Sequence, residues 1–201
     1  MIELIAITDD PAAPAPPLRA VRSGGLAVLC APAEDAVVTP AALWRREALL
    51  ESLMEDRDLL PVRYGTRVAD ERAAAAAVAG RGGELRARLE RVRGAVELAV
   101  RARPRETEAA PPAARSGREY LAARLGRSRA AVALHEPLAA LARASAIQPG
   151  DELLRAAYLV DRTAVAAFAD RVGELQRAHP QLALVCTGPW PPYSFAEGAG
   201  A

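Results

Sequence analysis

Lysine is absent from this sequence of 201 residues, and charge of either sign is in balance. All 26 basic residues are arginine, and they stand against 25 acidic residues, which gives a formal net charge of +1 at neutral pH. Such a balance creates no general attraction to nucleic acid or to an anionic membrane surface. The arginine- and alanine-rich composition is typical of GC-rich coding. We therefore expect neither nucleic acid nor a membrane as a partner.

Long apolar runs are also missing. No uninterrupted apolar stretch approaches the roughly 20 residues that cross a bilayer as a helix. Residues 1–7 lack the basic region of a signal peptide and are too short for its apolar core. These features predict a cytoplasmic protein.

Cysteine and histidine are scarce, and this limits metal and catalytic chemistry. Cys30 and Cys186 each follow an apolar run and have no CxxC neighbour, which favours two free thiols that pack as small hydrophobic side chains. His135 lies two residues before a proline, and His179 lies at an expected helix end, so both are interpreted as structural. No nucleophile elbow, P-loop or HExxH pattern occurs. We expect no enzyme, no cofactor, no metal and no small-molecule substrate.

Aromatic residues are few, yet three of the eight fall within six positions near the end of the chain. Prolines in the same stretch fix the backbone near polyproline II and remove amide donors, so we expect it to leave the last sheet. The stiff segment either folds back as a clasp between domains or presents its rings to a partner. The candidate residues are Trp190, Pro191, Pro192, Tyr193 and Phe195.

The first half of the chain alternates short strands with helices. A Gly-Gly pair at 24–25 between two apolar runs predicts a hairpin. Thr39-Pro40 predicts a helix start, with Leu43, Leu50, Leu53 and Met54 on its buried face. The remaining expected elements are strands at 2–7 and 59–64, a helix capped by Asp70, and a second helical stripe through Leu85, Leu89 and Val92.

The second half has a regular order of elements. Residues 95–101 alternate as a half-buried strand, and the proline-rich, charged stretch 103–115 reads as a solvated loop. Ser116 opens a helix with Leu121 and Leu125 inside, and Pro137 either kinks this helix or starts another one. A strand pair around residues 148–151 follows, then a helix capped by Asp161 and a last strand at 182–186. This βαββαβ order predicts a ferredoxin-like fold.

The fold class expected is therefore α+β, with two small domains and a tail. The limits are 1–93 for an N-terminal α+β domain, 94–187 for a C-terminal ferredoxin-like domain and 188–201 for a Pro/aromatic tail. The segment Leu60–Thr66 leaves two interpretations open. Arg63 and Tyr64 either face a partner from a sheet edge, or Tyr64 packs while Arg63 bonds a nearby carboxylate.

Four separated segments resemble one known family. They are Leu60-Pro61-Val62-Arg63-Tyr64-Gly65-Thr66, Gly94-Ala95-Val96-Glu97, Gly117-Arg118-Glu119-Tyr120-Leu121, and the run from Thr187 to Phe195 with its preceding Tyr158-Leu159-Val160. In this order they are similar to the gas vesicle GvpF/GvpL family. The chain departs from the pattern in its first helix, where Arg46 stands in place of the family's frequent histidine.

The resemblance implies an accessory protein of gas vesicle formation. It would be a minor vesicle component that binds the small hydrophobic shell protein, limits its aggregation during nucleation and meets other vesicle accessory proteins. An exposed sheet edge or a groove would hold the shell protein. The alternative is a small-ligand-binding or regulatory α+β module unrelated to vesicles, since ferredoxin-like folds host many functions.

Overall fold

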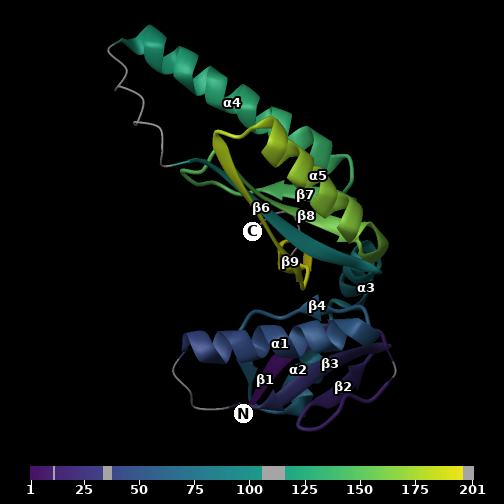
Figure 1. The fold of residues 1–201 in the computed structure, drawn as a ribbon. Coiled ribbons are helices and arrows are strands. Elements are labelled where there is room, and N and C mark those ends of the chain that lie inside the picture. The colour runs from purple at the N-terminus through teal and green to yellow at the C-terminus, as the bar shows by residue number, and fades with distance from the viewer. Residues whose placement is uncertain (11, 34–37, 106–115, 197–201) are drawn as a thin grey trace. The chain divides into compact units, whose positions relative to one another are not determined.

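The computed structural model describes residues 1–10, 12–33, 38–105 and 116–196, and it divides into two compact units (Figure 1). The N-terminal unit combines Met1–Ala95 with the segment from Trp190 onward, and the C-terminal unit is Val96–Pro189. Both units mix helices with a sheet, which confirms the α+β class. The domain limits expected above concern parts that fold independently, and they stay a prediction.

The N-terminal unit is built on a mostly antiparallel sheet. Its elements are β1 (Ile2–Thr8), β2 (Arg19–Ser23), β3 (Leu26–Pro32), α1 (Pro40–Asp56), β4 (Leu60–Pro61), β5 (Arg67–Val68), α2 (Glu71–Ala79), α3 (Gly82–Val92) and the late helix α6 (Tyr193–Ala196). The strand order is β2-β3-β1-β4, and β5 also pairs with β1. The predicted hairpin is present between β2 and β3, where Gly24 and Gly25 both take the positive φ that other residues rarely adopt.

Helix α1 begins as predicted, and three of the four side chains predicted for its buried face are buried. Thr39 accepts a hydrogen bond from the Ala42 amide, and Pro40 occupies the first helical position. The buried side chains are Ala42, Arg46, Leu50, Leu53 and Met54. Leu43 is exposed instead, so its assignment to the buried face was wrong. The buried face of α1 therefore includes one charged side chain, Arg46.

The C-terminal unit has the ferredoxin-like order. Its elements are β6 (Ala95–Pro104), α4 (Gly117–Ala139), β7 (Ala144–Ile147), β8 (Leu154–Asp161), the 3-10 turn η1 (Arg162–Ala164), α5 (Val165–Ala178) and β9 (Leu182–Trp190). In the sheet order β7-β8-β6-β9, the first and third strands of the unit along the chain, β6 and β8, pair at the centre of the sheet, as in a ferredoxin-like fold. Tyr158 and Phe168 are fully buried between the sheet and the helices, with ring centroids 5.2 Å apart.

Several expectations for the C-terminal unit were wrong in detail. Leu121 and Leu125 are exposed, although Ser116 caps α4 by accepting from the Glu119 amide as predicted. No new helix starts at Pro137, which lies inside the last turn of α4, and the kink there stays a prediction. Asp161 makes no capping hydrogen bond and instead pairs with Arg143. Most of the loop expected at 103–115 lies outside the described residues, and β6 continues through Pro104.

No helix among the described residues combines the length and the apolar character that a bilayer crossing demands.

Candidate functional site

The aromatic tail belongs to the N-terminal unit. Strand β9 continues through Pro189 to Trp190, and after Pro191 and Pro192 the chain closes in α6. The expected polyproline ribbon that leaves the sheet was therefore wrong in two ways. Pro189 is tolerated because β9 is an edge strand, and prolines are well suited to the residues just before and at a helix start.

Phe195 anchors this tail. Its side chain is 2 % exposed, and the Arg91 guanidinium of α3 lies 5.8 Å from the ring centroid. Arg88, also on α3, donates a hydrogen bond of 3.1 Å to the Ala196 carbonyl. Pro191 and Pro192 are buried as well, and Trp190 is half-buried. The tail is therefore part of the packed core of this unit.

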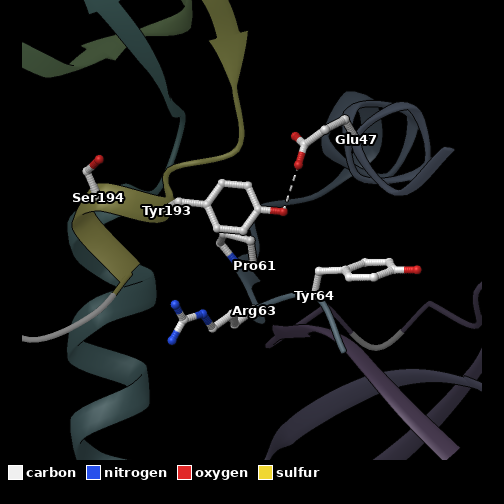
Figure 2. A pocket seen from close by; sticks show the side chains of 6 residues that line it. All are labelled: Glu47, Pro61, Arg63, Tyr64, Tyr193 and Ser194. Atoms are coloured by element: carbon white, nitrogen blue, oxygen red, sulfur yellow. Dashed lines mark hydrogen bonds between the residues drawn. The ribbon is translucent and has the colours of Figure 1, made fainter. Parts of the chain in front are cut away.

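Tyr193, on the same short helix as Phe195, contacts helix α1. Its hydroxyl donates a hydrogen bond of 3.1 Å to Glu47 Oε1, across 146 positions of sequence (Figure 2). Partial burial raises the pKa of Glu47 above the ordinary glutamate value, against the lowering effect of the Tyr193 hydrogen bond. A carboxyl group that is harder to ionise thus lies at the junction of α1 and α6.

The Leu60–Thr66 segment lies beside the Tyr193–Glu47 contact. Only Leu60 and Pro61 are in a strand, which corrects the expected strand 59–64, because the chain turns at Tyr64 and Gly65. Thr66 donates to the Arg63 carbonyl through both its amide and its hydroxyl, and Gly65 takes φ +80°. A positive φ is costly for residues with a side chain, which explains the glycine in this motif.

A buried ion pair between α1 and β1 stabilises the turn at Tyr64 and Gly65. Arg46 of α1 is 4 % exposed at its side chain and pairs with Glu3 of β1. The Glu3 carboxylate also accepts from the Gly65 amide at 3.1 Å, and the Arg46 guanidinium lies 5.4 Å from the centre of the Tyr64 ring. Arg46 thus links the helix, the sheet and the turn.

These elements enclose a pocket of about 420 Å³, called the tail pocket below. Figure 2 shows Tyr193 reaching from α6 toward Glu47, with Arg63 on the opposite side of the pocket. Arg63 is exposed, and within the described chain no carboxylate pairs with it, unlike the structural interpretation given above. The residues that line the tail pocket are Glu47, Pro61, Arg63, Tyr64, Tyr193 and Ser194.

The structure brings together three of the seven predicted site residues. Arg63, Tyr64 and Tyr193 line the tail pocket, whereas Trp190, Pro191, Pro192 and Phe195 hold the tail in place beside it.

Sequence reasoning missed Glu3, Arg46 and Glu47. Arg46 carried a signal, because it stands four residues after Ala42 and four before Leu50 on the buried stripe of α1. Glu47 carried none, since its partner Tyr193 is remote in the sequence.

The raised pKa of Glu47 gives a pH dependence. The folded state holds this proton more tightly than the unfolded state, so the contribution of Glu47 to stability falls as pH rises from 4.5 through the raised pKa. Glu47→Gln keeps an acceptor for Tyr193 but cannot ionise. We expect melting curves to show the variant gaining stability over wild type as pH rises through this window. A difference that stays constant with pH would contradict the prediction.

Histidine and cysteine take structural places. His135 Nδ1 and the Tyr158 hydroxyl share a hydrogen bond of 2.9 Å, and His179 ends α5 by donating its amide to Leu175. Cys30 is buried and Cys186 half-buried, both as free thiols, and burial raises the pKa of each. Across the described residues, no group of three or more His, Cys, Asp or Glu side chains is placed to hold a metal ion.

Comparison with known proteins identifies the family of this chain. The family described as gas vesicle synthesis protein GvpL/GvpF matches residues 6–197. The chain belongs to the GvpL/GvpF family. Family members are accessory proteins of gas vesicles and are not known as enzymes, so a gas vesicle-related role follows for this chain.

Two curated relatives support the assignment. Gas vesicle protein F2 of Halobacterium salinarum is 28 % identical over 172 residues, which cover 79 % of this chain and 70 % of the relative. Gas vesicle protein L of a Streptomyces species is 34 % identical over 137 residues, which cover 54 % of this chain and 51 % of the relative. The chain thus spans about half the length of the second relative.

Two crystal structures of GvpF share the fold. The protein from an Anabaena species gives a TM-score of 0.79 at 18 % identity and covers 99 % of both chains. The protein from Microcystis aeruginosa gives a TM-score of 0.81 at 17 % identity and covers 98 % of both chains. The agreement along the whole chain confirms the fold of both units.

Proposed function

We propose that this GvpL/GvpF protein acts in the cytoplasm, together with other vesicle accessory proteins. There it binds the small hydrophobic shell protein of the gas vesicle and limits its aggregation during nucleation, and it stays as a minor vesicle component. The observation that carries the proposal is the tail pocket. It joins the two motif segments that carry the resemblance most specifically, Leu60–Thr66 and Trp190–Phe195.

The chemistry of the pocket suits a peptide segment that carries an acidic group beside an apolar one. Arg63 offers an exposed guanidinium that pairs with no carboxylate of the described residues, and a guanidinium binds carboxylates through two parallel hydrogen bonds. Pro61, Tyr64 and Tyr193 supply apolar and aromatic walls, and such rings serve as anchors at protein interfaces. The packed tail and the buried Arg46–Glu3 pair hold these groups in place before a partner arrives, which lowers the ordering cost of binding.

A groove is better supported than strand addition. Strand β9 is a sheet edge, but the Gln176 side chain accepts from the Leu184 amide at 2.9 Å and donates to the Leu182 carbonyl at 2.8 Å. This part of the edge is already occupied, as natural proteins commonly arrange. In the N-terminal unit, Pro61 of β4 has no amide to donate.

The test is co-expression with the shell protein of the same host, followed by affinity purification through a tag on this chain. We expect the wild-type protein to keep the shell protein in the soluble fraction and to co-purify with it. Arg63→Glu should abolish co-purification, because it reverses the charge at the pocket. Arg72→Glu is the matched control, since Arg72 is an exposed arginine on α2 of the same unit and lies outside the residues that line the pocket. Failure of the wild-type protein to associate, with both proteins soluble, would refute the proposal.

A further inference from the structure

Helix α4 exposes an apolar stripe outside the tail pocket and in the other unit. Leu121 is 58 % exposed, Leu125 is 59 % exposed and Val132 is 46 % exposed. Figure 1 shows why: the N-terminal half of α4 runs beyond the sheet of its own unit. Its C-terminal half packs normally, with Leu134 and Leu138 fully buried. The first half of a 23-residue helix therefore presents large apolar side chains with no core beneath them.

The exposed apolar side chains lie along one line of the helix, with Ser128 between Leu125 and Val132. At about 100° per residue, Leu121, Leu125 and Val132 fall within an arc of about 40° and span about 16 Å along the helix axis. This length corresponds to about three helical turns.

The stripe continues into a hollow of about 300 Å³ beneath the helix. Val132 and His135 of α4 form one wall of the hollow, and Ile147, which is 65 % exposed, forms part of another. The stripe offers an apolar contact surface along the helix, and the hollow at its end offers a place for one side chain of a partner. An amphipathic helix bound in a groove uses both kinds of contact.

Arginines flank the stripe on both sides. Arg124 lies about 60° to one side of Leu121, whereas Arg118 and Arg129 lie about 60–80° to the other. Within the described residues none of the three pairs with a carboxylate, and all are exposed. Residues 117–131 hold four arginines against one glutamate. Over residues 117–131 the surface thus has apolar side chains along its middle and arginines on both margins, whereas Glu136 and Glu152 lie nearer the hollow.

The chain itself supplies no apolar side chains from the segments next to this stripe. Residues 106–115, which precede α4, include no large apolar residue. We take the occupant to be a segment of another molecule, which must match an apolar line with positive margins.

The geometry points to α4 as a docking surface for an acidic amphipathic helix of a partner protein. The partner helix would lay about three turns of apolar side chains along Leu121, Leu125 and Val132, with its last apolar residue in the hollow beside Ile147. Glutamate or aspartate on its margins would face Arg118, Arg124 and Arg129. This surface is separate from the tail pocket, so the two binding events are tested separately.

The experiment measures binding of a fluorescent helical peptide of about 16 residues to the full chain by anisotropy. The probe has leucine and alanine on one face and glutamate on its flanks, and a second peptide has lysine in place of glutamate. We expect only the acidic peptide to bind. The double variant Leu121→Ala/Leu125→Ala and the double variant Arg124→Glu/Arg129→Glu should each weaken binding at least about tenfold. Leu141→Ala, at another partly exposed leucine of the same unit, should leave it unchanged.

Three results would overturn the proposal. The first is equal binding of both peptides, or no binding of the acidic peptide at about 1 mM. The second is binding of phosphatidylserine vesicles that the leucine double variant loses, in the absence of peptide binding, which would assign the surface to a membrane. The third is self-association of the chain that the same variant abolishes. Circular dichroism of each variant checks that the fold is intact, as expected for exposed positions.

Discussion

Replacement of Phe195 by alanine is expected to lower the free energy of unfolding of the N-terminal unit by about 3–5 kcal/mol. The ring is 2 % exposed and packs in the unit whose strands lie more than a hundred residues earlier in the sequence. Its loss leaves a cavity and loosens the tail, whose Ala196 carbonyl accepts from Arg88. Urea unfolding followed by tryptophan fluorescence measures the effect directly, because both tryptophans, Trp44 and Trp190, belong to this unit.

The control for Phe195→Ala is Leu43→Ala. Leu43 is 42 % exposed on α1 of the same unit, so its truncation is expected to stay within about 0.5 kcal/mol of wild type. A loss below about 1 kcal/mol for Phe195→Ala would show that the tail is not part of the core.

Arg46→Met is expected to cost about 3 kcal/mol. The substitution keeps most of the side-chain volume but leaves the Glu3 carboxylate, only 14 % exposed at its side chain, without its counter-charge. Glu3 retains the Gly65 amide, which limits the loss. The same fluorescence-detected unfolding measures it.

The double variant Glu3→Gln/Arg46→Met is the control for the ion pair. Because it leaves no unpaired buried charge, it should be more stable than Arg46→Met alone. A double variant less stable than Arg46→Met would contradict the account of this pair.

Features encoded by neighbouring residues could be predicted from the sequence. Thr39, Asp70 and Ser116 each cap a helix through an amide three residues ahead, and the Gly-Gly turn shapes its own hairpin. The ferredoxin-like order followed from the same local signals. Such features depend on backbone chemistry within a few residues, which the sequence displays.

The errors came from tertiary context. Leu121 and Leu125 have a helical spacing typical of a core face, yet no sheet lies under that part of α4. Arg46 is charged but buried, because Glu3 from a distant strand pairs with it.

Only part of the tail pocket could be predicted from the sequence. Its two motif segments were recognisable separately. The Tyr193–Glu47 hydrogen bond that joins the tail to α1 connects residues 146 positions apart, and no local pattern predicts such a contact.

The most direct test of the central claim, that the tail pocket is the binding site for the shell protein, is the dissociation constant of Arg63→Ala for that protein. The account predicts binding at least about tenfold weaker than wild type, with an unchanged unfolding curve, because the Arg63 side chain is exposed and the substitution keeps the backbone carbonyl that accepts from Thr66. Arg72→Ala should bind as wild type does. Equal affinity of Arg63→Ala and wild type, or an equal loss in Arg72→Ala, would contradict it.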